Sequence, residues 1–249
     1  MVAALEAKGL TKEFKGFVAV NNIDLSVEKG TIHALIGPNG AGKTTCFNLL
    51  TKFLQPTRGT ITYEGRDITR MKPAEIARLG MVRSFQISAI FPDLSVLQNV
   101  RVALQRARGE SYDFWRSDKV LSKFDDQARS HIDEVGLTEF TNERAAALPY
   151  GRKRALEIAT TLALSPDMLL LDEPMAGMGR EDVDRIAQLI RKIAENRTVL
   201  MVEHNLSVVA DLSDRITVLA RGEILAEGSY AEISKAPEVI EAYIGASHD

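Results

Sequence analysis

A glycine-rich segment at residues 37–45 constrains this chain more than any other part of its sequence. It follows an apolar run at 31–36 that is typical of a buried strand, and it precedes a stretch at 43–54 with helical spacing of apolar residues. Strand, loop and helix in this order satisfy the pattern G-x-x-x-x-G-K-[ST], whose backbone N–H groups point at phosphate oxygens. The segment predicts a nucleotide-phosphate site, and the alternative is a glycine turn that only caps the helix.

The residues of this loop are expected to contribute in different ways to binding nucleotide phosphates. Lys43 offers a positive charge to the β- and γ-phosphates, and the Thr44 hydroxyl can ligate Mg²⁺. The start of the helix adds its dipole. The predicted nucleotide-binding set here is Gly37, Pro38, Asn39, Gly40, Ala41, Gly42, Lys43, Thr44 and Thr45.

Two acidic residues end a second apolar strand, at 168–171. A parallel strand delivers residues at its carboxyl end to the crevice where α/β sheets bind ligands. Asp172 is suited to hold Mg²⁺ through water, and Glu173 is suited to act as the general base on an attacking water. The alternative is a pair of solvated acids before the turn at Pro174, which is less attractive when a phosphate loop is present.

Composition excludes several classes of protein. The 249 residues carry a net charge of −3 and one cysteine, which leaves no internal disulfide and suggests a reducing compartment. No apolar run approaches the ~20 residues that span a bilayer, and no secretory signal is expected. The charge balance argues against a dedicated nucleic-acid binder.

Strands alternate with helices on both sides of a helical stretch that starts near residue 87, so we expect an α/β fold with a parallel sheet.

Three further segments select among the many proteins with such a loop. They are Gln86 after a strand at 81–85, the segment Leu148-Pro149-Tyr150-Gly151-Arg152 before a helix, and His204 after a strand at 198–202. Together with Phe14 in the first strand and the two motifs above, they make the chain resemble the nucleotide-binding subunits of ABC transporters. The resemblance extends over essentially the whole chain.

The resemblance implies a fold: a P-loop NTPase of the ABC ATPase cassette type, with a RecA-like core, an antiparallel β subdomain and an inserted helical subdomain. The core and the β subdomain are expected at 1–86 and 155–235, and the helical subdomain with the signature segment at 87–154. A C-terminal helix is expected at 236–249.

The resemblance also implies roles for single residues. Gln86 and His204 join Glu173 as catalytic residues; Gln86 senses Mg²⁺ and the attacking water, and His204 reaches the γ-phosphate. Phe14 stacks on adenine, and Val20 belongs to the same ATP-binding set. The metal ligands are then Thr44, Gln86 and Asp172. Each residue has a plainer alternative, because a lone glutamine is usually a surface residue, Phe14 could be a core aromatic, and an isolated histidine is more often structural.

The signature segment departs from the family pattern. Leu148, Pro149, Tyr150, Gly151 and Arg152 are expected to contact the ATP of a second cassette, but the family serine is Pro149 here, which offers neither a hydroxyl nor an N–H group. Tyr150 replaces a glycine and Arg152 a glutamine, while Gly179 stands where an interface aspartate is common. We still expect turnover, since Glu173 and the Mg²⁺ ligands are present.

The form of the signature, the segments 83–86 and 202–205 and the ending at 237–245 resemble the branched-chain or hydrophobic amino acid uptake subclass. The resemblance implies integral membrane permease subunits, a second ATPase subunit (identical or different) and, indirectly, a periplasmic or extracellular substrate-binding protein as partners, with no nucleic acid. It places the chain in the cytoplasm, peripheral on the inner face of the membrane. Uptake of urea, short amides or aromatic acids, export of lipopolysaccharide or lipid, a non-transport ABC ATPase on nucleic acid and a scaffold without turnover remain alternatives.

Overall fold

A computed structural model describes residues 2–84, 90–107 and 122–245. The chain divides into two compact units: unit 1 holds 1–81, 167–174 and 190–249, and unit 2 holds 82–166 and 175–189. This division places residues 82–84, 155–166 and 175–189, which we expected in the core, with the helical unit. For 155–162 the reason is that the helix they belong to packs on two other helices of unit 2.

An antiparallel sheet of four strands forms one part of unit 1. Its strands are β1 (Ala3–Phe14), β2 (Phe17–Glu28), β4 (Arg58–Tyr63) and β5 (Arg66–Asp67), in the order β2-β1-β4-β5. A two-residue turn at Lys15 and Gly16, both with positive φ, joins β1 to β2. Such a turn matches the right-handed twist of the two strands.

A six-stranded sheet forms the second part, in the order β10-β9-β3-β8-β7-β6. Its strands are β3 (Ile32–Ile36), β6 (Met81–Arg83), β7 (Met168–Asp172), β8 (Thr198–Val202), β9 (Arg215–Ala220) and β10 (Glu223–Gly228). The pairs β7–β8, β8–β3 and β3–β9 are parallel, and β9–β10 is antiparallel. Every residue of β3, β7 and β8 is buried. Strands of a parallel sheet are covered on both faces, which explains why these strands are continuous apolar runs.

Among the residues that the structure describes, five helices lie wholly in unit 1: α1 (Lys43–Leu50), α2 (Pro73–Arg78), α8 (Leu206–Leu212), α9 (Tyr230–Ile233) and α10 (Pro237–Gly245). Helix α1 ends at Leu50, earlier than the predicted residue 54. The Thr51 hydroxyl donates to the Phe47 carbonyl, and Lys52 adopts a φ of 64°, which no right-handed helix can continue. Helix α1 packs on β2 and β8, so the apolar side chains of α1 join both sheets in one core.

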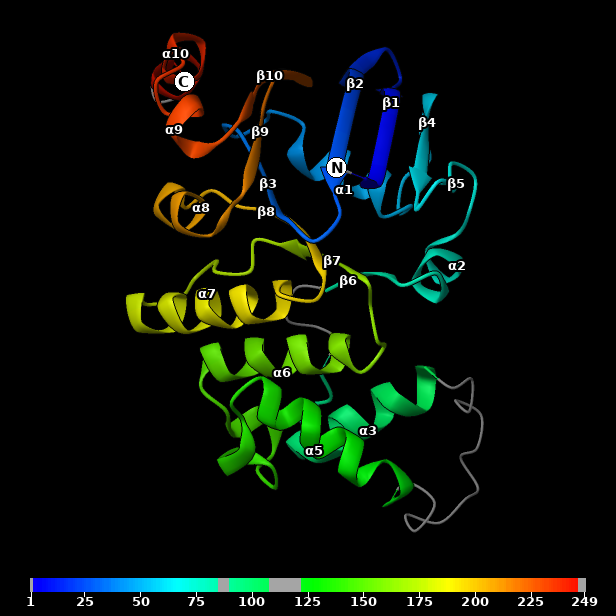
Figure 1. Ribbon diagram of the computed structural model, residues 1–249, viewed down its shortest axis with the longest axis vertical. Helices are drawn as coiled ribbons and strands as arrows, with labels where there is room; N and C mark the ends of the chain where they lie inside the picture. The colour runs from blue at the N-terminus through cyan, green and yellow to red at the C-terminus, as the bar shows by residue number, and fades with distance from the viewer. Residues whose placement is uncertain (1, 85–89, 108–121, 246–249) are drawn as a thin grey trace. The chain divides into compact units, whose positions relative to one another are not determined.

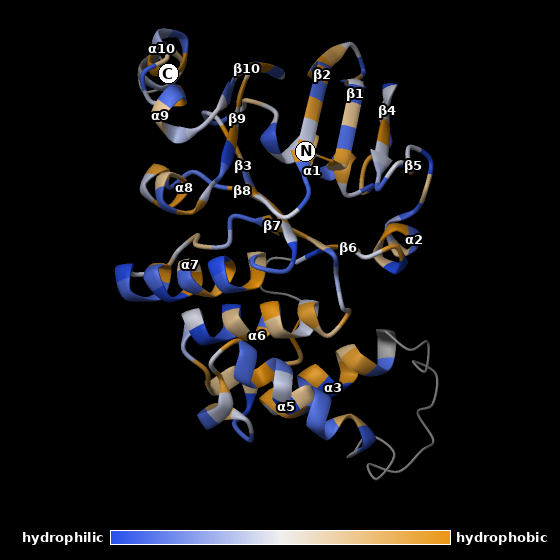
Figure 2. Cartoon of the chain, in the orientation of Figure 1, coloured by the Kyte–Doolittle hydropathy of each residue, from blue (hydrophilic) through white to orange (hydrophobic). Residues whose placement is uncertain are grey.

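Unit 2 is helical. Helices α3 (Val96–Ala107), α5 (Asp125–Glu134) and α6 (Tyr150–Leu162) pack against one another (Figure 1). Short 3-10 turns lie at Ser122–Phe124, Thr138–Phe140 and Ala145–Ala147, and α7 (Arg180–Ala194) begins in this unit. Hydrophobic and hydrophilic positions alternate along these helices, as one buried face requires (Figure 2). None of the helices in the described ranges has the length and hydrophobicity that a membrane crossing demands.

Candidate nucleotide-binding site

The register of the parallel strands brings the two predicted motifs to one edge of unit 1. Val202 on β8 pairs with Leu35 on β3 on one side and with Asp172 on β7 on the other. The residues that follow these strands are the glycine loop, Glu173 and the segment 203–205. They therefore leave the sheet side by side, although more than a hundred residues separate the loop from the acids.

Backbone crowding sets the shape of the loop. A Cβ atom at Gly37 would overlap the carbonyl oxygen of Leu219, and one at Gly42 would lie 2.6 Å from that of Ala19. The two glycines have φ values of 150° and 95°. Gly40 also has a positive φ, but no described atom lies within 4 Å of its Cβ position. The loop is thus tightly held at both ends and open at its exposed middle.

The start of α1 fits an anionic ligand. Gly42 is its N-cap and offers no side chain to the first turn. The first helical bond runs from the Cys46 N–H to the Gly42 carbonyl at 2.8 Å, so the N–H groups of Lys43, Thr44 and Thr45 have no acceptor within the helix. Phosphate oxygens are the usual partners of such groups. Cys46 itself is buried, and burial raises the pKa of its thiol to about 12, so it packs as a small hydrophobe.

Lys43 lies over the loop. Its Nζ donates to the Gly37 carbonyl at 2.6 Å and to the Pro38 carbonyl at 2.9 Å, which holds the ammonium beside the loop amides. Burial lowers the pKa of Lys43, and the negative charge of Glu173 opposes that shift. The charge of Lys43 and that of Glu173 therefore act on each other across the edge of the sheet. Thr44 is exposed, so its hydroxyl is available to a ligand.

The acidic pair has two different environments. Asp172 is the buried last residue of β7. Glu173 is half-buried and has a φ of 44°, a left-handed conformation that costs energy for any residue except glycine. Its N–H donates to the Val202 carbonyl at 2.9 Å, which holds the backbone in this conformation. Among the described residues, no three His, Cys, Asp or Glu side chains gather to hold a metal.

His204 is exposed at the same edge, and a residue that the sequence analysis missed positions it. The Glu203 carboxylate is fully buried and accepts the N–H groups of His204 and Asn205 at 3.0 and 3.2 Å. Asn205 then caps α8 by accepting the N–H groups of Ser207 and Val208. The available signal was a carboxylate at the end of an otherwise apolar run, where burial requires several hydrogen bonds.

Two further predicted residues lie in β1 and β2, and a third lies outside the described residues. Phe14 is 41% exposed near the tip of the β1–β2 hairpin, with the Lys12 ammonium 5.1 Å from the centre of its ring. Val20 is fully buried behind the loop, with its Cγ2 atom 3.7 Å from the Cβ position of Gly42. Gln86 lies outside the described residues.

The signature segment lies in unit 2 and forms the start of α6. Pro149 is the N-cap and supplies no side-chain hydrogen bond, and Leu148 is buried. The Tyr150 hydroxyl donates to the Ala176 carbonyl at 3.2 Å. Arg152 Nη1 donates to the Gly136 carbonyl at 2.9 Å, with its guanidinium over the Phe140 ring. The polar side chains of this segment thus bond within their own unit. The backbone N–H groups of the first turn of α6 are left to contact a ligand.

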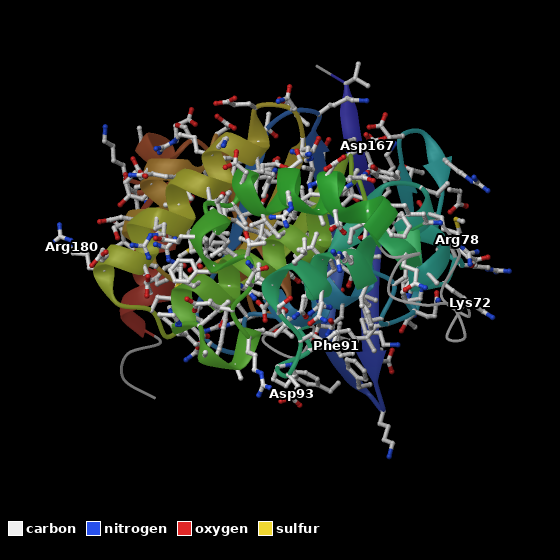
Figure 3. The ribbon with its side chains drawn as sticks, turned by 90° about the horizontal axis from the view of Figure 1, so that it is seen from below. Lys72, Arg78, Phe91, Asp93, Asp167 and Arg180 are labelled. Atoms are coloured by element: carbon white, nitrogen blue, oxygen red, sulfur yellow. The ribbon has the colours of Figure 1, made fainter. Side chains whose placement is uncertain are left out.

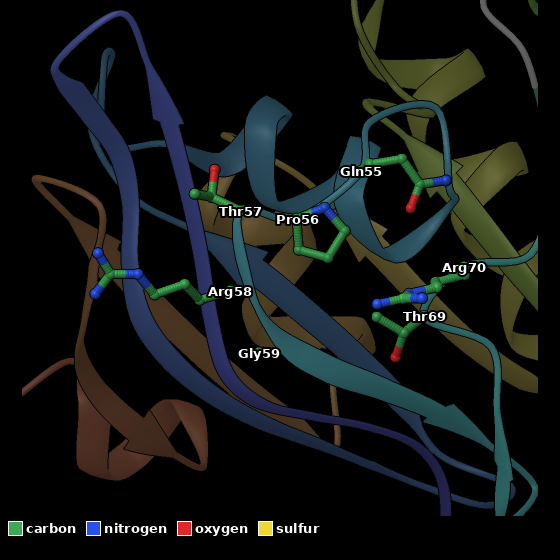
Figure 4. Close-up of a pocket in the computed structure, with 7 residues that line it drawn as sticks. All are labelled: Gln55, Pro56, Thr57, Arg58, Gly59, Thr69 and Arg70. Carbon is green, nitrogen blue, oxygen red and sulfur yellow. The ribbon is translucent and has the colours of Figure 1, made fainter.

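A surface hollow elsewhere in unit 1 has no comparable arrangement. It is lined by Gln55, Pro56, Thr57, Arg58, Gly59, Thr69 and Arg70. In Figure 4 the Arg58 guanidinium extends away from the other labelled residues, whereas the Arg70 side chain lies beside Thr69, so the two charges do not converge on a ligand.

Comparisons with known proteins identify the family. The ABC transporter family model matches residues 20–176, and the model of the branched-chain amino acid ATP-binding cassette transporter matches residues 223–249. The chain is 41% identical to the high-affinity branched-chain amino acid transport ATP-binding protein BraF of Pseudomonas aeruginosa, and 38% identical to LivG of Escherichia coli K12. In both cases 97% of each chain is covered.

Solved structures show the same architecture. The crystal structure of the ADP conformation of an ATP-binding cassette of an ABC transporter superposes with a TM-score of 0.86 at 29% identity, covering 98% of this chain and 100% of that one. Fold and site define a P-loop ATPase of the cassette type. The chain belongs to the ABC transporter family, and it is an ATP-binding subunit that hydrolyses ATP.

Proposed function

We propose that this ATPase powers an importer for branched-chain or other hydrophobic amino acids. The observation that carries the substrate class is the pair of matches at 41% and 38% identity over 97% of the chain, both to proteins named for branched-chain amino acid transport. The match of residues 223–249 to the corresponding C-terminal model supports it independently of the motifs that all cassettes share.

The chemistry is assigned to residues at the edge of unit 1. Lys43 and the N–H groups of α1 bind the phosphates, with the loop glycines allowing close approach. The Thr44 hydroxyl and Asp172 hold Mg²⁺, which supplies charge neutralisation on the phosphates. Glu173 accepts a proton from the attacking water, and its fixed backbone aims the carboxylate. His204, positioned by Glu203, reaches the γ-phosphate, and Phe14 stacks on the base.

A second cassette completes the site in this proposal. The first turn of α6 in one chain presents its N–H groups to the ATP held by the loop of another, identical or different, chain. Such a head-to-tail pair closes when ATP adds contacts across the interface and opens after hydrolysis.

The membrane subunits dock, in this proposal, on the turn before α3. Phe91 is 52% exposed there. The buried Asn99 side chain holds the turn, accepting the Phe91 N–H at 2.7 Å and donating to the Phe91 carbonyl at 3.0 Å. Phe91 and Asp93 lie next to each other at the lower edge of the view in Figure 3. An exposed aromatic on a rigid turn suits an apolar pocket of a permease, on the cytoplasmic face of the membrane.

Transport by the reconstituted complex tests this function. The chain is co-expressed with its neighbouring membrane subunits and binding protein, and ATP-dependent uptake of labelled leucine, urea and benzoate into vesicles is measured. We expect leucine uptake that disappears when Glu173→Gln replaces the wild-type chain. ATP-dependent uptake of urea or benzoate but not of leucine would contradict the substrate class. Co-purification with nucleic acid and no membrane protein would contradict transport itself.

A further inference from the structure

A carboxylate lies against the start of the signature helix in unit 2. Gly151 is the second residue of α6, and a Cβ atom at this position would overlap the carboxyl group of Asp182. Asp182 belongs to the first turn of α7. Gly151 is therefore needed for a reason besides phosphate approach: any side chain there would displace the carboxylate.

Arg185 holds this carboxylate and a second one. Its Nη1 donates to Asp182 Oδ1 at 2.8 Å, and its Nη2 donates to Glu181 Oε1 at 2.9 Å. The two acids differ in exposure, because the side chain of Asp182 is 30% exposed and that of Glu181 is 89% exposed. Solvent screens Glu181 strongly, whereas the charge of Asp182 acts on the end of α6.

We propose that Asp182 is a positioning residue that sets how strongly the start of α6 attracts the phosphates of ATP bound to a second cassette. The inference rests on the proposed head-to-tail function. It assigns a restraining role to the charge of Asp182 and a compensating role to Arg185.

The sign of the effect follows from elementary electrostatics. The positive end of the α6 dipole is shared between the Asp182 carboxylate and any phosphate that arrives, and the two anions repel each other. Removing the negative charge therefore strengthens ATP-driven association. Removing the Arg185 charge leaves the Asp182 carboxylate uncompensated, so ATP-driven association becomes weaker. A purely structural role predicts the opposite for Asp182, because loss of the carboxylate would loosen the first turns of α6 and α7.

The test measures the ATP concentration that gives half-maximal dimer formation, by light scattering, with every variant placed in the Glu173→Gln chain so that ATP persists. Asp182→Asn keeps the size of the side chain and an acceptor for Arg185. We expect it to lower the half-maximal ATP concentration about threefold to tenfold, and Arg185→Gln to raise it by a similar factor. Glu181→Gln is the matched control: it removes an acid from the same turn and from the same arginine, and it should change the value less than twofold.

Salt supplies a second readout. The shift caused by Asp182→Asn should shrink at 0.5 M salt, since screening weakens charge effects but not packing. An Asp182→Asn chain that dimerises less readily, or equally to its parent, overturns the inference while leaving the proposed function in place. A parent chain that binds ATP but never dimerises overturns both the inference and the head-to-tail function.

Discussion

In the proposed mechanism, the edge of unit 1 and the start of α6 in unit 2 bind phosphate by different means. At the edge of unit 1, the proposal assigns the chemistry to side chains: Lys43, Asp172 and Glu173 have the identities and positions that the motifs require. At the start of α6, Tyr150 and Arg152 bond within their own unit. The backbone N–H groups at this helix start are left to bind phosphate, and the amide of one residue there does not depend on the side chain that a neighbouring residue carries. The difference explains why the signature can lose its serine while the acidic strand keeps both carboxylates.

The largest effect that this comparison predicts is the loss of the base in unit 1. Glu173→Gln should lower the steady-state rate of phosphate release at least ~10²-fold, the scale of a lost general base, with ATP affinity retained. Equilibrium binding of labelled ATP and a phosphate-release assay separate the two quantities. The exposed Glu195→Gln serves as a charge-matched control and should behave like the wild type. Unchanged turnover would remove Glu173 from this role.

The loop backbone provides the next largest effect. Gly42→Ala forces a Cβ atom toward the Ala19 carbonyl at a φ of 95°, whereas Gly40→Ala meets only the cost of its positive φ. We expect Gly42→Ala to lower the free energy of unfolding by about 3 kcal/mol and Gly40→Ala by about 1 kcal/mol. Chemical denaturation of the two variants checks the difference, and equal losses would show that crowding does not shape the loop.

Acid should weaken unit 1 through a buried histidine on β3. Burial lowers the pKa of His33 to about 4, with the charge of Arg215 acting in the same direction, and its Nε2 lies 2.8 Å from the Thr217 hydroxyl. Below pH 6.5 the unfolded chain binds a proton that the folded chain excludes, so stability falls as the pH drops toward 4. The free energy of unfolding should fall about 2 kcal/mol more between pH 7 and pH 5 in the wild type than in His33→Asn. Parallel pH profiles would refute this assignment.

The smallest effect concerns the signature side chain. Arg152→Gln loses the hydrogen bond to Gly136 and the contact with the Phe140 ring. We expect the free energy of unfolding to fall by about 1 kcal/mol while the rate of ATP hydrolysis stays within about threefold of the wild type. A hydrolysis loss of a hundredfold at unchanged stability would mean that this guanidinium serves the nucleotide after all.

The sequence predicted the parts of the site that are local in the chain. The loop is recognisable because its glycines, Lys43 and the start of α1 follow one another directly, and the fold class follows from the alternation of apolar strands and helices. The contacts of Glu203, Asn99 and Asp182 were not predictable, because each depends on where tertiary packing places a carboxylate or amide relative to a backbone group. The boundary between the two units was not predictable from the sequence either, because α6 joins unit 2 through its tertiary packing on α3 and α5.

The central claim is that the loop in unit 1 becomes an active site only when unit 2 of another cassette meets it. The specific ATPase activity at saturating ATP, measured over a hundredfold range of total cassette concentration, tests this most directly. Our account predicts an activity per chain that is low in dilute solution and rises to a plateau as cassettes pair. An activity per chain that stays constant over the whole range would show that one chain holds a complete site and would contradict the account.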